Sequence, residues 1–231
     1  DLRKQEKGIA YRIVEELGII DRKSMNKEID NLDIESRRKL KKYGIIIGKY
    51  SIYINNVLKP QYTSIIPGLW LIYNKINLKL EEIKNQINAL PKPGITSCNI
   101  NKKVFKNLYK YSGYKVLGNY AVRIDILERL DKLIYENIKN NKNRNQFNIN
   151  DKMISLLGTS AQELKKLLTN LGYIIKKDDD DAKKIIWFAD IKKTRKLYTQ
   201  KNSYRKDPSE SKNGIFKDTD VKKLKDKLSN I

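Results

Sequence analysis

The sequence predicts a mainly helical α+β protein with a β-hairpin in its N-terminal part and a winged-helix-like module toward its C-terminal end. Apolar residues recur at spacings of three and four in several segments, which is typical of amphipathic helices. The β-branched run Ile45–Ile47 and the alternating stretch Ser51–Ile54 are typical of two short strands. Residues 151–191 read as helix, turn, helix and hairpin, the order of a winged helix.

The 231 residues are enough to form more than one hydrophobic core. Changes in composition divide the chain into a helical part with a hairpin at 45–54, a middle helical part, the winged-helix-like module and a basic tail that we expect to be disordered. The corresponding residue ranges are 1–90, 91–140, 151–191 and 192–231.

The N-terminal part begins with a predicted helix over residues 5–17, which Gly18 ends. After a polar connection, residues 34–43 predict a short basic helix that Gly44 ends before the hairpin. We expect the inward face of the first helix to consist of Ile9, Ile13, Val14 and Leu17.

The hairpin stretch GIIIGKYSIYI resembles a phosphate-binding loop at first sight. Such a loop needs four residues between its glycines and a hydroxyl residue directly after the lysine. Only Ile45–Ile47 separate Gly44 from Gly48, and Tyr50 occupies the hydroxyl position. The stretch therefore predicts a hairpin with its turn at residues 48–50, and the chain has no ATP site of its own there.

The next segment predicts one long helix from about Pro67 to Ile87. Pro91–Gly94 then marks an internal boundary. Beyond it we expect a helix over 101–111, an extended piece over 114–117, a helix over 121–140 capped by Asn119, and a flexible linker over 139–150. The buried stripe of the long helix is predicted to hold Leu69, Tyr73, Ile76, Leu80, Ile83 and Ile87.

The winged-helix-like module combines several specific signals. Residues 152–157 predict a short helix, and Ser160 with Glu163 forms a capping box that opens a second helix. Two predicted strands, 173–176 and 184–188, flank the acidic loop 178–181. Gly172–Tyr173 follows its helix as Gly113–Tyr114 does, although this similarity is too weak by itself to establish a repeat. The inner side of the second helix is predicted to hold Ala161, Leu164, Leu167, Leu168 and Leu171.

The net charge of +22 makes a polyanion the expected partner, because each neutralised phosphate releases counterions. The tail over 192–231 carries +8 and the remainder +14, so the charge is not confined to the tail. A chain rich in Lys, Ile and Asn is also what an AT-rich genome encodes, which weakens this inference without removing it.

The composition excludes several classes of site. With no His and a single Cys98, the chain holds no cysteine–histidine zinc site, serine–histidine triad or intrachain disulfide. No apolar run has the length of a membrane span, and no signal peptide is recognisable, so we expect a cytoplasmic protein without a membrane partner. The chain starts without Met, and we expect it to be a piece of a longer polypeptide.

Basic residues gather at two places, the first hairpin with its preceding helix, where tyrosines lie among them, and the second helix of the winged-helix-like module with its wing. Lysines there are expected to hold phosphates while tyrosines such as Tyr43 and Tyr50 stack on bases, whereas Tyr53 is expected to be a strand residue. The alternative is a solvated charged face or a protein-binding one. The predicted nucleic-acid-binding residues are Arg37, Arg38, Lys41, Lys42, Lys49, Tyr50, Gln162, Lys165, Lys166, Thr169, Lys176, Lys177, Lys183 and Lys184, with Asn170 also expected to face outward.

Evidence for catalysis in the sequence is weak. The triplet Asp190–Ile191–Lys192 is similar to the carboxylate and lysine element of some Mg²⁺ nucleases, with Asp125 as a conceivable partner, but such triplets arise by chance in a chain that is one-third charged. Arg123 and Asp125 either mark a functional site or support the start of their helix. The sequence therefore contains no catalytic motif and predicts no metal site.

Several segments occur in the same order as in certain bacterial helicase-related proteins. These segments are 8–18, 43–51 with 58–60, 113–118 with 121–130, and 155–158 with 171–173, and together they extend over most of residues 8–188. In this respect the chain resembles the region that follows the two motor domains of mitochondrial degradosome-type, superfamily-two RNA helicases of the DEAD/DEAH class. The resemblance implies a parent ATP-dependent helicase, a hydrolase whose ATP and Mg²⁺ are bound outside this chain, so no cofactor is expected here.

From these observations we expect a nucleic-acid-binding accessory C-terminal region of an ATP-dependent helicase, which holds single-stranded RNA, or less favourably DNA. The alternative is a protein-interaction module that docks a nuclease or a ribosomal partner. A split-gene product or free-standing relic of such a helicase is compatible with the same sequence.

Overall fold

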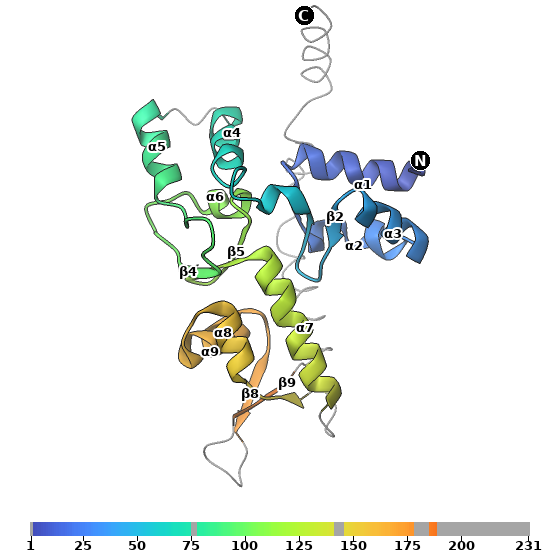
Figure 1. The fold of residues 1–231 in the computed structure, drawn as a ribbon, viewed down its shortest axis with the longest axis vertical. Helices are drawn as coiled ribbons and strands as arrows, with labels where there is room; N and C mark the ends of the chain where they lie inside the picture. The colour runs from blue at the N-terminus through green and yellow to red at the C-terminus, as the bar shows by residue number, and fades with distance from the viewer. Residues whose placement is uncertain (1, 75–77, 141–145, 178–184, 189–231) are drawn as a thin grey trace, which may run out of the picture. The chain divides into compact units, whose positions relative to one another are not determined.

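The computed structural model describes residues 2–74, 78–140, 146–177 and 185–188, with the backbone alone considered at 175–177 and 185–188. It is an α+β fold, as predicted, in which helices alternate with short antiparallel strands (Figure 1). The chain forms two compact units. The first holds the described residues up to Ile87 together with Tyr111–Gly113, and the second holds Asn88–Lys110 and those from Tyr114 onward.

The first unit begins with a module of helices around a three-stranded sheet. Its elements are α1 (Lys4–Glu15), β1 (Ile19–Asp21), the 3₁₀ helix η1 (Arg22–Met25), α2 (Asn26–Asp30), α3 (Ile34–Lys42), β2 (Ile45–Ile47) and β3 (Ser51–Ile54). The strands pair antiparallel in the order β1-β3-β2, with Ile20 and Ile47 both opposite Ile52. The predicted hairpin and the basic helix before it are thus confirmed, whereas the polar connection contains a strand, a 3₁₀ helix and an α-helix that were not predicted.

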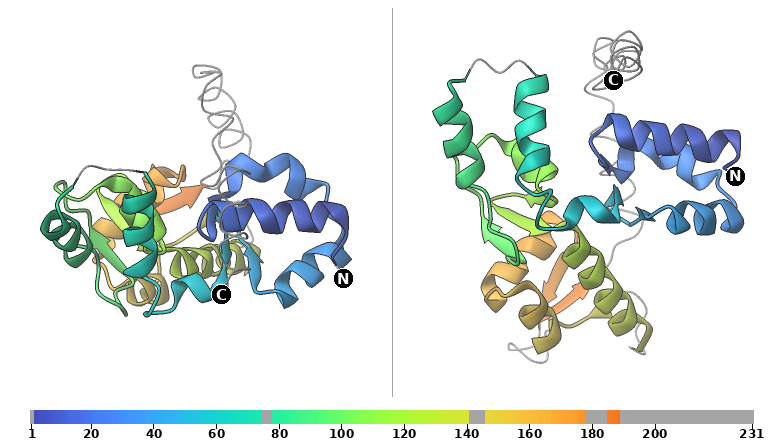
Figure 2. Two further views of the ribbon diagram at one scale, coloured as in Figure 1. Left: turned by 90° about the horizontal axis from the view of Figure 1, so that it is seen from above. Right: turned by 45° about the horizontal axis from the view of Figure 1, so that its top comes forward.

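The core of this module lies between α1, α3 and the sheet. α1 and α3 lie side by side although about twenty residues separate them (Figure 2). Ile9 and Ile13 are buried, as predicted, but Val14 is exposed, so the inward face of α1 is narrower than expected. The cluster of buried apolar residues comprises Ile9, Ile13, Ile20, Met25, Ile29, Leu32, Leu40, Ile45 and Ile52.

The predicted long helix over 67–87 is wrong. The structure has two helices instead, α4 (Ile65–Tyr73) and α5 (Leu80–Asn88), after a 3₁₀ helix η2 (Asn55–Leu58). The side-chain amide of Asn74 donates to the carbonyl of Trp70 at 2.8 Å, and the N–H of Lys79 donates to the carboxylate of Glu82 at 2.7 Å. These two contacts satisfy backbone groups at a helix end and a helix start, which stabilises the break.

The residues predicted to form the buried stripe of this segment are also wrong, because other positions of the helices face inward. Leu69 is 51% exposed and Leu80 is 68% exposed, whereas Ile66 and Leu71 are buried. α4 packs through Ile66 and Trp70 on Tyr111, whose ring stacks on the Trp70 ring at a centroid distance of 5.5 Å. Because α4 is apolar on nearly every side, its spacing alone could not indicate which side faces inward.

The second unit begins with β4 (Ser97–Asn99), α6 (Lys106–Tyr111), β5 (Tyr114–Leu117) and β6 (Tyr120–Arg123). The predicted helix over 101–111 is therefore shorter than expected, and β4 was missed. Asn119 is not a helix cap: it lies with Gly118 in the two-residue turn between Leu117 and Tyr120. The following helix α7 (Ile124–Asn140) begins three residues later than predicted, because residues 120–123 pair with both β4 and β5.

The C-terminal module of this unit consists of α7, β7 (Gln146–Phe147), α8 (Asp151–Leu157), α9 (Ala161–Asn170), β8 (Ile174–Lys177) and β9 (Ile185–Phe188). α8 packs beside α7, and α9 follows α8 (Figure 2). The Ser160–Glu163 capping box and the buried leucines of α9 confirm the prediction, except that Ala161 is exposed. Residues 146–147 are not linker: they pair with β9, and Phe147 is fully buried.

The three sheets share one topology. In each sheet the last strand lies between the other two, giving the orders β1-β3-β2, β4-β6-β5 and β7-β9-β8. In each, the hairpin follows a helix directly through a glycine of positive φ, namely Gly44 (80°), Gly113 (87°) and Gly172 (94°). A positive φ favours glycine because it has no Cβ. The weak sequence similarity noted above thus accompanies a real repetition of strand, helix and hairpin.

A buried carboxylate ties α1 to α3 and makes a testable prediction about acid stability. Glu6 accepts hydrogen bonds from the Ser36 hydroxyl at 2.6 Å and from the Arg3 N–H at 2.7 Å, and these bonds lower its pKa. A carboxyl whose pKa is lower in the folded state stabilises the fold above its unfolded pKa and loses that contribution as the pH falls through the folded pKa.

We therefore expect Glu6→Gln to lower the melting temperature of the first unit at pH 7. As the pH is lowered from about 5 to 3, the melting temperature of this variant should fall less than that of the wild type. Thermal unfolding followed by circular dichroism across this pH range measures both effects. Glu81→Gln, an exposed position on α5 of the same unit, is the control. Equal pH dependence of Glu6→Gln and the wild type would contradict the role assigned to Glu6.

Candidate nucleic-acid interface

The first group of predicted residues lies on α3. Asp33 caps this helix by accepting the N–H of Ser36 at 2.6 Å. Three cations of the helix, Arg38, Lys41 and Lys42, are exposed. Two of them lie in the last turn, where positive charge interacts favourably with the helix dipole. α3 therefore presents a stable cationic face to solvent.

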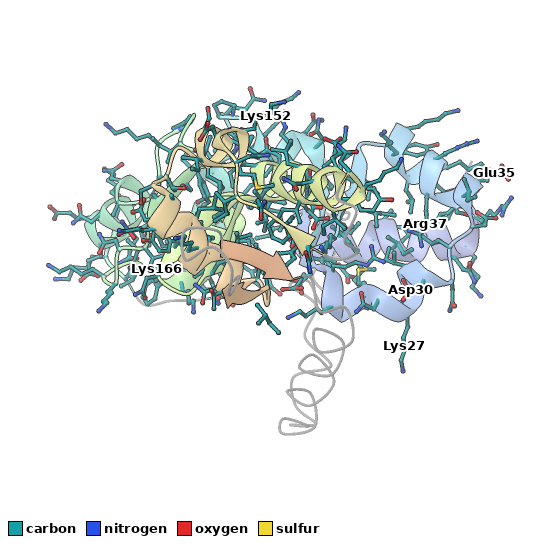
Figure 3. The ribbon with its side chains drawn as sticks, turned by 90° about the horizontal axis from the view of Figure 1, so that it is seen from below. Lys27, Asp30, Glu35, Arg37, Lys152 and Lys166 are labelled. Carbon is teal, nitrogen blue, oxygen red and sulfur yellow. The ribbon has the colours of Figure 1, made fainter. Side chains whose placement is uncertain are left out.

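Arg37 does not belong to that face. Its guanidinium donates to the carbonyl of Ile29 at 2.7 Å and to that of Leu32 at 3.3 Å, at the end of α2. Figure 3 shows Arg37 lying against the ribbon of this region, in contrast to Lys27, which extends away from it. Arg37 therefore has a structural role in holding α2 to α3, and only its remaining donors could meet a phosphate.

The tip of the β2–β3 hairpin carries Lys49 and Tyr50. The ammonium of Lys49 lies 5.3 Å from the centroid of the Tyr50 ring, an intramolecular cation–π contact. The N–H of Gly48 donates to the carbonyl of Ser51 at 2.9 Å, which closes the turn. One face of Tyr50 is thus occupied, and a base could stack there only if Lys49 moved.

Tyr43 is the more accessible aromatic residue of this group. It follows Lys41 and Lys42 at the end of α3, and it is 58% exposed. Tyr53, by contrast, is buried in β3, as the strand interpretation predicted. The structure therefore gathers Arg38, Lys41, Lys42 and Tyr43 on α3 and its C-terminal cap, with Lys49 and Tyr50 on the adjoining hairpin of the same module.

The second group lies on α9, where Gln162, Lys166 and Thr169 are exposed and Lys165 is half-buried. The Thr169 hydroxyl donates to the carbonyl of Lys165 at 3.0 Å, so it is partly engaged by its own helix. Lys166 is visible on the outer side of α9 in Figure 3. These positions follow the helical spacing that the sequence predicted.

Part of the outer face of α9 contacts the β5–β6 hairpin. The Asn170 amide donates to the carbonyl of Leu117 at 3.3 Å, and a Cβ at Gly118 would come within 2.5 Å of the same amide. The Tyr120 hydroxyl bonds to Glu163, whose pKa is lowered mainly by the N–H of Ser160. Asn170 is therefore a packing residue, and the cationic face of α9 is reduced to Gln162, Lys165, Lys166 and Thr169.

The remaining predicted residues belong to the wing of the winged-helix-like module or follow it in the sequence. Lys176 and Lys177 lie in β8, whose backbone pairs with β9. Lys183, Lys184, the acidic loop, Asp190, Lys192 and the basic tail lie outside the described residues.

The acid–base groups of the second unit have structural partners. Arg123, at the end of β6, and Asp125, in the first turn of α7, form a bidentate ion pair with N–O distances of 2.6 and 2.9 Å. The Tyr114 hydroxyl donates to the carbonyl of Ile95 at 2.7 Å, and burial raises its pKa to about 12. Burial also raises the pKa of the Cys98 thiol, which is therefore protonated at neutral pH.

Within the part of the chain that the structure describes, no three Cys, Asp or Glu side chains are grouped as metal ligands. None of the helices described there combines the length and apolar character needed to span a bilayer. Comparisons of the chain with protein-family models, with curated proteins and with solved structures found no match.

Proposed function

We propose that this chain is the nucleic-acid-binding accessory region of an ATP-dependent helicase. It holds single-stranded RNA, or DNA, by lysine–phosphate contacts and tyrosine stacking, and it performs no chemistry itself. ATP and Mg²⁺ would be bound by motor domains outside this chain. The helicase part of the proposal rests on the order of the sequence segments described above, and the binding part rests on surface charge.

The observation that carries the binding proposal is the cationic surface of α3 and the β2–β3 hairpin. Residues 36–80 contain nine Lys or Arg and no Asp or Glu, and Arg38, Lys41, Lys42 and Lys49 are exposed there. Neighbouring cations of this kind attract a phosphate chain strongly because they release its counterions. Tyr43 adds an exposed ring beside them, on which an unpaired base can stack.

A second argument comes from the order of elements around α9. We interpret α7 through β9 as a winged-helix-like module, because helix, strand, two helices and a hairpin follow one another with the third strand central in the sheet. In such modules the helix before the hairpin commonly contacts nucleic acid. That helix is α9, and α3 occupies the corresponding position before the β2–β3 hairpin.

The alternative, a module that docks a nuclease or a ribosomal protein, is favoured by one feature of α4. Ile65, Leu69 and Ile72 are all exposed and lie at spacings of four and three. Such an apolar stripe is typical of protein-binding helices. Association through this stripe would depend weakly on salt, because apolar burial carries no counterion release.

Salt dependence therefore distinguishes the two functions. We expect the affinity for a single-stranded RNA of about 20 nucleotides to fall by at least tenfold between about 50 and 200 mM salt. Lys165→Glu with Lys166→Glu is expected to weaken binding about tenfold at the lower salt concentration. Fluorescence anisotropy measures both, and DNA of the same sequence tests the preference for RNA.

Lys132→Glu with Lys139→Glu on α7 is the control, since both positions are exposed and the change in charge is the same. If the wild-type chain does not bind RNA at low salt, or binds with no dependence on salt, the proposed function is wrong.

A further inference from the structure

A second acid-free segment, most of it in the second unit, contains no residue of either predicted group. Residues 83–124 contain eight Lys or Arg and no Asp or Glu. By contrast, residues 125–191, which include the winged-helix-like module, carry a net charge of only +1. Among residues 83–191, the positive charge is therefore concentrated in the stretch that forms β4, α6, β5 and β6 and not in the stretch that forms α9.

An exposed part of this segment is the loop that leads into α6, which we call the 101–106 loop. Lys102, Lys103 and Lys106 are all exposed, and Phe105 between them is 41% exposed. A phenylalanine that keeps this much of its surface in water, flanked by three lysines, combines the two components of a single-strand binding surface. The ring can stack on a base while the ammonium groups contact the neighbouring phosphates.

The backbone of the 101–106 loop is held by several hydrogen bonds. The N–H of Asn101 donates to the Tyr109 hydroxyl at 2.8 Å, and the Asn101 side chain accepts the N–H of Lys103 at 3.0 Å. The N–H of Val104 donates to the Asn101 carbonyl at 3.1 Å. Because Val104, Tyr109 and Leu108 are buried, the loop is anchored from below. Binding would then cost little ordering of the backbone, which increases affinity.

The helix that follows the loop corresponds in topology to the helices of the other two sites. The loop leads into α6, the helix that precedes the β5–β6 hairpin, as α3 precedes β2–β3 and α9 precedes β8–β9. Each of these helices is followed by a glycine of positive φ and a strand. In the first and third modules the exposed cations lie on this helix, whereas in the middle module they lie at its start, where no acidic residue occurs nearby in the sequence.

We propose that the 101–106 loop is an additional binding site for single-stranded nucleic acid, in which Phe105 stacks on an unpaired base and Lys102, Lys103 and Lys106 contact phosphates. The proposal rests on the proposed function and extends it to a part of the surface that the sequence analysis did not assign. A duplex is not expected to bind in the same way, because its bases are already stacked on one another.

Two variants test the two kinds of contact separately. The first variant carries Lys102→Glu, Lys103→Glu and Lys106→Glu together, and we expect it to bind the single-stranded oligonucleotide at least tenfold more weakly. The slope of log K against log salt concentration should decrease in magnitude by up to about two. Phe105→Ala is expected to weaken binding about tenfold with an unchanged salt dependence, whereas Phe105→Tyr, which keeps the ring, retains most of the affinity.

The matched control replaces Arg129, Lys132 and Lys139 of α7 with Glu, because these exposed cations lie in the same unit beside Asp125, Glu128, Asp131 and Glu136. Circular dichroism checks that each variant is folded, and Lys→Gln variants replace any that is not. If the wild type binds and the loop variants lose no more affinity than the control, the proposal that the 101–106 loop binds nucleic acid is wrong, while the proposed function stands. If the wild type does not bind at all, both are wrong.

Discussion

Replacing Arg38, Lys41 and Lys42 of α3 with Glu is expected to weaken binding of single-stranded RNA by about one to two orders of magnitude at low salt. These three side chains are exposed on one helix within an acid-free segment, so each can meet a different phosphate. Each lost phosphate contact removes about 0.7 counterions, and the slope of log K against log salt should decrease by up to about two. Anisotropy titrations at several salt concentrations measure both quantities.

Charge reversal in the last turn of α3 also opposes the helix dipole and can destabilise the helix. Arg38→Gln, Lys41→Gln and Lys42→Gln remove the charges without this effect, so the Gln variant should lose affinity while it keeps its helical circular dichroism. Lys4, Lys7 and Lys27 replaced with Glu provide the control, since they are exposed elsewhere on the same unit. A loss of affinity equal to that of the control would mean that net charge, and not α3, governs binding.

The largest expected effect on stability is that of Phe147→Ala, with a loss of about 3–5 kcal/mol in the second unit. Phe147 is fully buried, and its ring meets that of Tyr173 edge to face at a centroid distance of 5.2 Å. The Tyr173 hydroxyl donates to the carboxylate of Asp131 on α7 at 3.3 Å. Truncation of Phe147 therefore leaves a cavity beside Tyr173, between β7 and α7, and removes an aromatic pair.

Hydrogen exchange resolved by peptide is the suitable measurement, because it separates the two units. Protection in α8 and α9 should fall while protection in α1 and α3 remains. Phe147→Leu, which fills most of the volume, should cost about 1 kcal/mol. A change below about 0.5 kcal/mol for Phe147→Ala would show that residues 146–147 behave as surface residues, as the linker prediction implied.

Local signals in the sequence were sufficient wherever one short segment determines its own structure. Gly44 and Gly48 with the intervening isoleucines predicted the first hairpin at its observed residues. The Ser160–Glu163 capping box predicted the start of α9, and its leucine spacing predicted the buried side. These features depend on caps, turns and periodicity, which act within about four residues.

Prediction failed wherever a distant contact decides between alternatives. Residues 120–123 continue the apolar pattern of α7, yet they form β6 because they pair with β4 on one side and β5 on the other. The Asn- and Lys-rich stretch around Phe147 has the composition of a linker, but Phe147 is buried by residues more than twenty positions away. α4 has apolar residues on nearly every side, and tertiary contacts such as that with Tyr111 select the buried one.

For the candidate sites, too, the sequence determined some features and tertiary contacts determined the others. Composition established that cations are in surplus, and helical spacing established which residues of α3 and α9 could share a face. Which polar side chains keep their donors available was decided by tertiary contacts, because Arg37 is held by the carbonyls of Ile29 and Leu32 and Asn170 by that of Leu117. A guanidinium or amide that satisfies buried carbonyls is no longer fully available to a ligand, and no local pattern reveals where those carbonyls will be.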